Sequence, residues 1–199
     1  MAIKLSKTAS DLLREIIDRV ISAEDEVVVA RVVICGQPDQ CMLVELMPRG
    51  ELGQICVGFK YGGALTGEKM RKLREFLFLE FDLVPKVINC GQWVCGTKDE
   101  VLTVLKAVAE KFLTSTDYEA GAVADIRWGR RESLVYILGT DRRIRRYVVK
   151  GLVEQLRLKK RFLKKFLELR LAGGKIVTLP LSDSEEPLVK AVVEGEFLT

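Results

Sequence analysis

The sequence predicts an α+β protein in which an antiparallel sheet of about four strands is backed by helices and is followed by a long basic amphipathic C-terminal helix. Three observations support this fold class. β-Branched runs are separated by short turn-rich segments, apolar residues recur at helical spacing on either side of them, and Lys and Arg concentrate at 127–175. We therefore expect an α+β domain at 1–139 and a helical region at 140–199.

The first half of the sheet is predicted by a change of period near residue 26. Within the first 22 residues, apolar side chains recur three and four positions apart, which indicates an amphipathic helix. Apolar, β-rich runs then occupy 26–34, 41–47 and 54–61, with short turn segments between them. Strands joined by such short connections form an antiparallel meander.

The segments after residue 61 are predicted to form a helix, a strand and a second helix. Thr66 is placed to cap a helix that ends before Pro85, and residues 85–95 read as one strand or a tight strand pair. Thr97 and Glu100 have the spacing of a capping box, which predicts another helix directly after them.

The last third is predicted to be helical. Thr140 or Asp141 can cap a basic amphipathic helix that runs through Leu171, and a short strand at 175–181 and an acidic helix follow it. Its heptad-like apolar stripe favours packing against a second copy, as a homodimer or homotetramer; the alternative is that the stripe closes over its own sheet. The residues expected at the oligomer contact are Leu152, Leu156, Phe162, Leu163, Phe166 and Leu167.

Charge is divided unevenly along the chain. Residues 127–175 hold 16 Lys and Arg against 4 Asp and Glu, a net +12, and the remaining 150 residues hold 16 against 24, a net −8. A concentrated basic segment on an acidic body is typical of polyanion binders, because each cation set against a phosphate releases condensed counterions. The alternative is an ordinary solvated helix face.

Aromatic residues lie among these arginines, which favours single-stranded nucleic acid over other polyanions, because unpaired bases stack on π-faces. Trp128, Tyr136 and Tyr147 are the aromatics concerned, and burial against the sheet is the alternative for Trp128 and Tyr136. A second aromatic surface is predicted on the strand QICVGFKYGG, where Phe59 and Tyr61 share a face. Core packing is the favoured alternative for Phe59.

Several catalytic classes are disfavoured. The chain has no histidine, which removes the commonest general base and zinc ligand. GGALTGEKM, at 62–70, lacks the Lys-Ser/Thr pair that a Walker loop places after its last glycine. We expect no cofactor, no metal site and no enzymatic activity.

The five cysteines leave at least one thiol free in a monomer. Cys35 with Cys41, and Cys90 with Cys95, bracket predicted turns, so each pair forms either a cross-turn disulfide or two small buried side chains; Cys56 has no evident partner. Asparagine occurs once, and charged residues are abundant, as in hyperthermophile proteins. With no signal-peptide or membrane-spanning segment in the sequence, we expect a cytoplasmic protein.

The stretches VGFKYGG, IRWGRRESLVYIL and LRLKKRFLKKFLELRL, together with the predicted architecture, resemble the ThermoDBP-related family of archaeal single-stranded DNA-binding proteins. The resemblance implies sequence-independent binding of single strands in a cleft with an apolar floor and basic edges, in the context of DNA replication and repair, and oligomerisation through the C-terminal region. The floor candidates are Phe59, Tyr61, Trp93 and Trp128. The edge candidates are Lys60, Arg71, Arg74, Arg127, Arg130 and Arg131.

The expected function is therefore single-stranded DNA binding by the domain at 1–139, with bases held by stacking and phosphates by Arg and Lys. Two alternatives stay open. One is an RNA-binding component of an archaeal ribonucleoprotein, and the other is a scaffold whose basic segment contacts an acidic protein partner.

Overall fold

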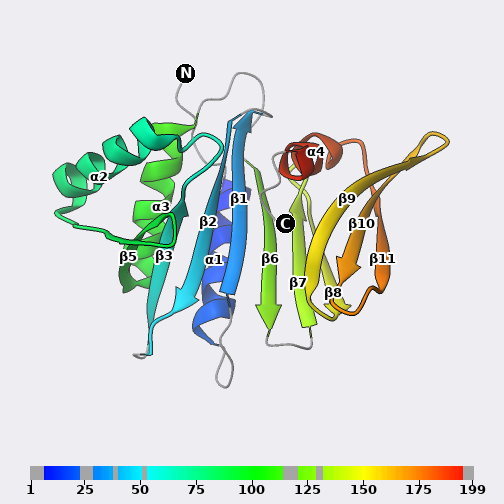
Figure 1. Cartoon of the computed structure of the whole chain (residues 1–199), viewed down its shortest axis with the longest axis horizontal. Coiled ribbons are helices and arrows are strands. Elements are labelled where there is room, and N and C mark those ends of the chain that lie inside the picture. The colour runs from blue at the N-terminus through cyan, green and yellow to red at the C-terminus, as the bar shows by residue number, and fades with distance from the viewer. Residues whose placement is uncertain are drawn as a thin grey trace.

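The protein forms two antiparallel sheets and four helices in the part of the chain that the computed structural model describes. That part comprises residues 7–22, 29–37, 40–50, 53–113, 121–128 and 132–194, with the backbone alone at 37 and 121–128. Figure 1 shows α1 behind strands β1 and β2, and the smaller sheet with α4 to the right of them.

The large sheet has eight strands in the order β4-β5-β3-β2-β1-β6-β7-β8, and every neighbouring pair is antiparallel. Its strands are β1 (Val29–Gln37), β2 (Gln40–Pro48), β3 (Gln54–Lys60), β4 (Lys86–Ile88), β5 (Gly91–Thr97), β6 (Gly121–Trp128), β7 (Glu132–Leu138) and β8 (Ile144–Lys150). The small sheet, in the order β11-β10-β9, consists of β9 (Val153–Arg161), β10 (Lys164–Leu171) and β11 (Ile176–Leu181).

Three helices pack on one face of the large sheet, and the fourth packs on the other. They are α1 (Lys7–Ile21), α2 (Gly67–Phe81), α3 (Lys98–Phe112) and α4 (Glu186–Glu194). α3 begins as its sequence predicts, because the Thr97 Oγ1 accepts a hydrogen bond from the Glu100 N–H at 3.3 Å. Thr66 is the N-cap residue of α2, but its side chain makes no capping hydrogen bond.

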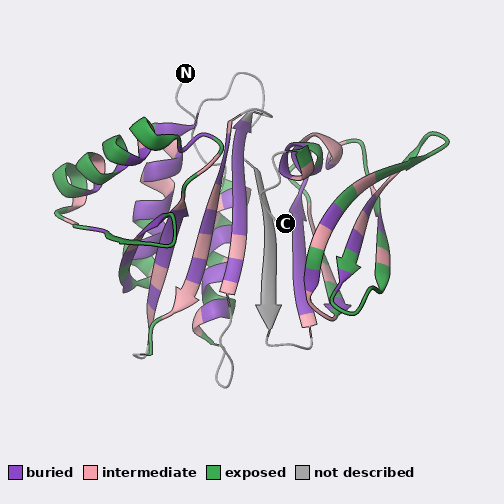
Figure 2. Ribbon diagram, viewed as in Figure 1, coloured by how far each residue is buried: buried purple, intermediate pink, exposed green. Residues whose placement is uncertain are grey.

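Two hydrophobic cores lie on opposite faces of the large sheet, because successive side chains of a strand point in opposite directions. Val32 and Ile34 of β1 face α1 to α3 in the first core, whereas Val33 and Cys35 face the small sheet and α4 in the second. Figure 2 shows buried residues along β1 and along the sheet-facing sides of α1 and α3. The large sheet is therefore the middle layer of the fold.

The predicted long C-terminal helix is wrong: residues 140–171 contain β8, β9 and β10, and the described C-terminal helix, α4, is short. The leucines in this region follow a period of two, which suits a strand. In the register of the hairpin, Leu156 lies opposite Leu169 and Leu158 lies opposite Leu167, so these four side chains share the inward face. Burial of that face overrides the helical propensity of leucine.

The predicted sheet of about four strands is also too small. β6, β7 and β8 extend it beyond β1, and the expected boundary at residue 139 lies between β7 and β8, which are hydrogen-bonded neighbours. Ser133 then ties the large sheet to the start of the small one. Its buried Oγ donates to the Gly151 carbonyl at 2.8 Å and accepts from the Val153 N–H at 3.2 Å.

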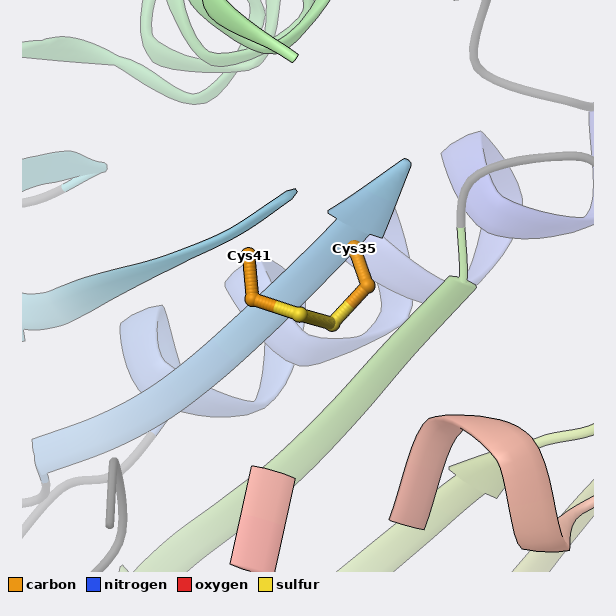
Figure 3. Close-up of a disulfide and its surroundings, with 2 residues drawn as sticks. All are labelled: Cys35 and Cys41. Atoms are coloured by element: carbon orange, nitrogen blue, oxygen red, sulfur yellow. A yellow bond between two sulfur atoms is a disulfide. The ribbon is translucent and has the colours of Figure 1, made fainter. Parts of the chain in front are cut away.

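Two disulfides link neighbouring strands of the large sheet. Cys35 and Cys41 are opposite each other on β1 and β2 and form one of them (Figure 3). Cys56 on β3 pairs with Cys95 on β5, opposite it in the register, and Cys90 is free and exposed. The predicted Cys90–Cys95 disulfide is therefore wrong, because β3 lies beside β5 and places Cys56 directly opposite Cys95.

None of the helices in the described residues has the length and apolarity that a membrane span requires.

Candidate nucleic-acid interface

The aromatic floor predicted on β3 and β5 is divided between the two faces of the sheet. Phe59 is fully buried in the first core, on the face covered by helices, and cannot contact a ligand there. Trp93 lies on the opposite face and packs across Gly58, where an added Cβ would come within 2.4 Å of the indole. Phe59 and Trp93 therefore do not form one surface, because neighbouring positions of paired strands alternate between faces.

Lys60 is occupied beside Trp93. Its Nζ donates to the Asn89 carbonyl at 2.8 Å and lies 5.8 Å from the centre of the Trp93 ring. Tyr61 is 60% exposed, and Arg71 and Arg74 are exposed on α2. These three side chains remain accessible.

The other four predicted contacts, at 127–131, have side chains that the structure does not describe. Arg127 and Trp128 belong to β6, of which the structure describes the backbone, and Arg130 and Arg131 lie outside the described residues.

Two arginines of the basic segment hold the edge strand β8 to its surroundings. The Arg146 Nη2 lies 3.0 Å from a Glu15 carboxylate oxygen on α1, and its guanidinium lies 5.9 Å from the Tyr136 ring centre. The Arg145 Nε donates to the Glu185 carboxylate at 2.9 Å, and its guanidinium lies 5.2 Å from the ring centre of Tyr147. These arginines therefore stabilise the fold.

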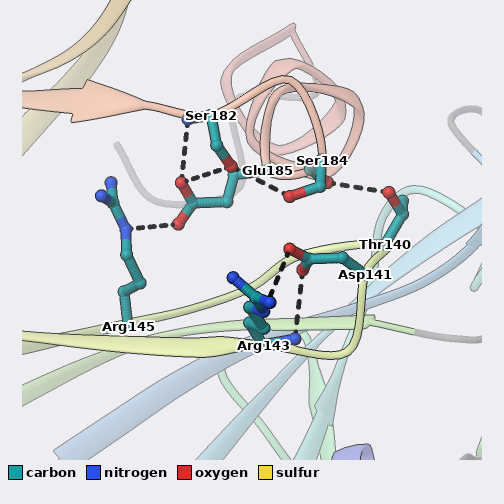
Figure 4. A network of polar contacts seen from close by, with 7 residues as sticks. All are labelled: Thr140, Asp141, Arg143, Arg145, Ser182, Ser184 and Glu185. Carbon is teal, nitrogen blue, oxygen red and sulfur yellow. Dashed lines mark hydrogen bonds and ion pairs between the residues drawn. The ribbon is translucent and has the colours of Figure 1, made fainter.

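The Arg145 contact belongs to a polar network before α4, shown in Figure 4. The buried Glu185 carboxylate also accepts from the Ser182 N–H and from the Ser182 hydroxyl, each at 2.9 Å. The Thr140 N–H donates to the Ser184 carbonyl at 2.8 Å. The Ser182 side chain and backbone and the Glu185 carboxylate, three positions apart, are arranged as in a helix cap. Because that carboxylate is already paired with Arg145, it is not free to act as a general base for the Ser182 hydroxyl.

Burial raises the pKa of both tyrosines under these arginines. The Tyr136 phenol is almost completely buried, and loss of solvation disfavours its anion more than the nearby arginines favour it. The pKa of Tyr147 is raised for the same reason.

A free set of cations lies instead on the outer face of the small sheet. With Leu156 and Leu158 facing inward, the alternate residues of β9 and their partners on β10 face solvent. We call this surface the basic face and define it by its exposed cations, which are Arg157, Lys159, Arg161, Lys164 and Arg170. None of them forms an ion pair with another described residue. Glu168 is the single acidic residue between 157 and 170.

The basic face contains an aromatic side chain in a hollow. Phe166 is half-buried and lies opposite Lys159 in the strand register and next to Pro180 on β11. The hollow has a volume of about 400 Å³ and is lined by Lys159, Lys160, Arg161, Phe166, Glu168 and Thr178. An apolar floor with cations at its rim therefore exists on β9 and β10, on elements other than those predicted.

The predicted oligomer stripe is dispersed by the strand geometry. Leu156 and Leu167 are buried in the second core, and Leu152 is half-buried just before β9. Phe162 and Leu163 lie at the exposed hairpin turn, and Phe166 lies on the outer face. The long C-terminal helix through which a homodimer or homotetramer was expected is replaced by β8, β9 and β10 and the turns between them.

The period of two in QLRLKK and LELRL is the sequence signal that would have located the basic face. No group of three or more Cys, Asp or Glu side chains among the described residues is arranged to hold a metal ion. Comparison of the chain with protein-family models, with curated proteins and with solved structures gave no match.

Proposed function

We propose that this protein binds single-stranded DNA without regard to base sequence, through the basic face of its small sheet. The observation that carries the proposal is the combination of five exposed, unpaired cations with a half-buried phenyl ring in a hollow between them. We place this function in the cytoplasm and expect binding without catalysis.

The cations would hold the phosphate backbone. Arg157, Lys159 and Arg161 alternate along β9, so their Cα atoms are spaced by about 6.6 Å at 3.3 Å per residue. That spacing is close to the separation of successive phosphates in an extended single strand. Backbone contacts of this kind carry no base information, which supports sequence-independent binding.

The hollow would hold a base. Stacking of a base on an aromatic side chain contributes about 1 to 3 kcal/mol and tolerates any base, because every base has a π-face. Phe166 offers its ring in a hollow whose rim is basic. Only an unpaired base exposes its face fully, so this arrangement favours a single strand over a duplex.

The resemblance to ThermoDBP-related proteins is consistent with the same kind of site, an apolar floor between basic edges. LRLKKRFLKKFLELRL, one of the stretches on which it rests, forms the hairpin of β9 and β10. The site would therefore lie in this stretch, in place of the strand around Phe59.

Fluorescence anisotropy of a labelled mixed-sequence single strand, titrated at several salt concentrations, tests the proposal. The triple variant Arg157→Ala/Arg161→Ala/Lys164→Ala should bind more weakly, and the slope of log K against log salt should fall in magnitude by about 2, at about 0.7 per lost phosphate contact. The matched control is Arg71→Ala/Lys72→Ala/Arg74→Ala, which removes the same side-chain types from the exposed surface of α2.

An unchanged slope in the hairpin variant would refute the basic face as the site, and loss of binding in the α2 variant would move the site to α2. Unlabelled duplex and RNA serve as competitors. A duplex that competes as well as the single strand contradicts single-strand binding, and RNA that competes better favours the ribonucleoprotein alternative.

A further inference from the structure

The turn that joins β9 to β10 exposes two large apolar side chains. Phe162 is 98% exposed and Leu163 is 93% exposed, and they are the two residues between Arg161 and Lys164, which pair in the register. In Figure 1 this hairpin projects at the upper right beyond β11, and in Figure 2 its end is coloured as exposed. The second core gains nothing from either side chain.

The backbone conformation of this turn does not favour a phenylalanine at position 162. Phe162 has a φ of 55°, in the left-handed region that Gly, Asn or Asp usually fill in a two-residue hairpin turn. A left-handed backbone disfavours any residue that has a Cβ, and a fully exposed side chain gains no burial energy that would offset this. A strained, exposed aromatic residue indicates a role outside the folding of the chain.

The apolar pair is enclosed by positive charge on both strands. Lys159, Lys160 and Arg161 precede it and Lys164 follows it, all four exposed. Lys165, the next residue on β10, is occupied by an ion pair with Glu186 on α4, which holds the hairpin to the body near its turn. Two exposed apolar side chains surrounded by free cations complement a partner with apolar groups between negative charges. Nucleic acid is such a partner, because its stacked bases lie between phosphates.

We propose that Phe162 and Leu163 form a wedge that enters between neighbouring bases and unstacks them, while the surrounding cations hold the phosphates on either side. This inference rests on the proposed function and extends it from passive binding to local unstacking. Apolar wedges of Phe and Leu unstack base steps in this way, against the free energy of base stacking. The wedge should therefore prefer forks and mismatches, where unstacking costs least.

Strands that carry the fluorescent base 2-aminopurine report on unstacking, because the probe brightens when its neighbours move away. The wild-type protein should brighten a probe in a single strand and should bind a mismatched duplex about tenfold more tightly than a perfect one. The variant Phe162→Ser/Leu163→Ser should lose the brightening and the mismatch preference, and its salt slope should stay unchanged because its cations remain.

The matched control is Leu79→Ser/Val84→Ser, which removes two apolar side chains, each 78% exposed, at the end of α2 and shortly after it. It should behave as the wild type. All four substituted residues are exposed, so thermal melting should confirm that both variants fold.

The outcomes distinguish failure of the wedge from failure of single-stranded DNA binding by the basic face. If the tip variant brightens the probe as the wild type does, the wedge is overturned and the basic face can still bind DNA. If the wild type binds no single strand at all, both proposals fail. If the tip variant binds DNA normally but no longer binds phosphatidylserine vesicles that the wild type binds, the tip serves an anionic lipid surface and the wedge is overturned.

Discussion

The two sides of the large sheet use their charges in opposite ways. On the helix side, Arg146 pairs with Glu15 and Lys98 pairs with Asp18, so that cations join helix to sheet or helix to helix. On the side of the small sheet, Arg145 and Lys165 anchor the elements around α4, but the outer surface leaves its cations unpaired. Cations of the same type therefore stabilise the body and remain available for a ligand on the hairpin.

This difference explains why net charge alone does not locate a site. The segment 127–175 carries +12, yet part of that charge is bound within the fold and part lies on the basic face. Surface ion pairs contribute only about 0 to 1 kcal/mol each, so pairing matters here mainly for which cations a polyanion can reach.

The largest expected effect is the contribution of the two disulfides to the free energy of unfolding. Both disulfides lie in the large sheet, and they close loops of different length, with sequence separations of 39 for Cys56–Cys95 and 6 for Cys35–Cys41. Because loop entropy rises with length, we expect the first to contribute about 4 kcal/mol and the second about 2 kcal/mol to the free energy of unfolding.

Urea unfolding of two variants, each with and without reductant, checks this. In Cys35→Ala/Cys41→Ala the oxidised-minus-reduced difference reports on Cys56–Cys95 alone, and in Cys56→Ala/Cys95→Ala it reports on Cys35–Cys41. Comparing each variant with itself cancels the cavity that the substitution leaves. Equal differences would show that loop length does not set these contributions.

The next prediction concerns how much the second core stabilises the small sheet. Leu167→Ala removes a fully buried side chain of β10 and should lower the free energy of unfolding by about 2 to 5 kcal/mol. Leu163→Ala deletes the same atoms from the same hairpin where they are exposed, and should change it by about 0.5 kcal/mol or less. Thermal or urea unfolding measures both. Similar losses would argue against the strand register that separates these two leucines.

The smallest effect concerns pH on the helix side. Because burial raises the pKa of Tyr136 above its ordinary value of 10.0, the folded protein keeps this proton at a pH where the unfolded chain releases it. The resulting stabilisation is fully present below pH 10 and is lost as the pH rises through the folded-state pKa. Tyr136→Phe should therefore lose less stability than the wild type between pH 8 and pH 11 in urea unfolding. Parallel losses would contradict the raised pKa.

The first half of the fold could be predicted from sequence because its signals are local. The period of α1, the Thr97 cap of α3 and each of the runs that form β1 to β3 lie within a single segment of no more than 15 residues, the range in which periodicity is informative. The hairpin of β9 and β10 was misread because its leucines fit both a period of two and an irregular stripe of three and four.

The predicted aromatic floor is divided for a related reason. Phe59 and Trp93 look like companions along the chain, but the antiparallel register of β3 and β5 sets them on opposite faces. Cys56 found its partner through the same register, 39 positions away. Neither relationship has a local signal, because strand pairing joins distant segments.

The sequence by itself determined the composition-level properties of this protein: the absence of histidine, the division of charge and the alternation that lets strands bury one face. Only the tertiary structure decided which cations are free. Pairing of Arg145 and Arg146 depends on Glu185 and Glu15 arriving from distant elements, whereas the cations of the basic face form no ion pair with a described residue, although Glu168 lies opposite Arg157. Charge is fixed residue by residue, but its availability depends on which side chains the packed sheets bring together.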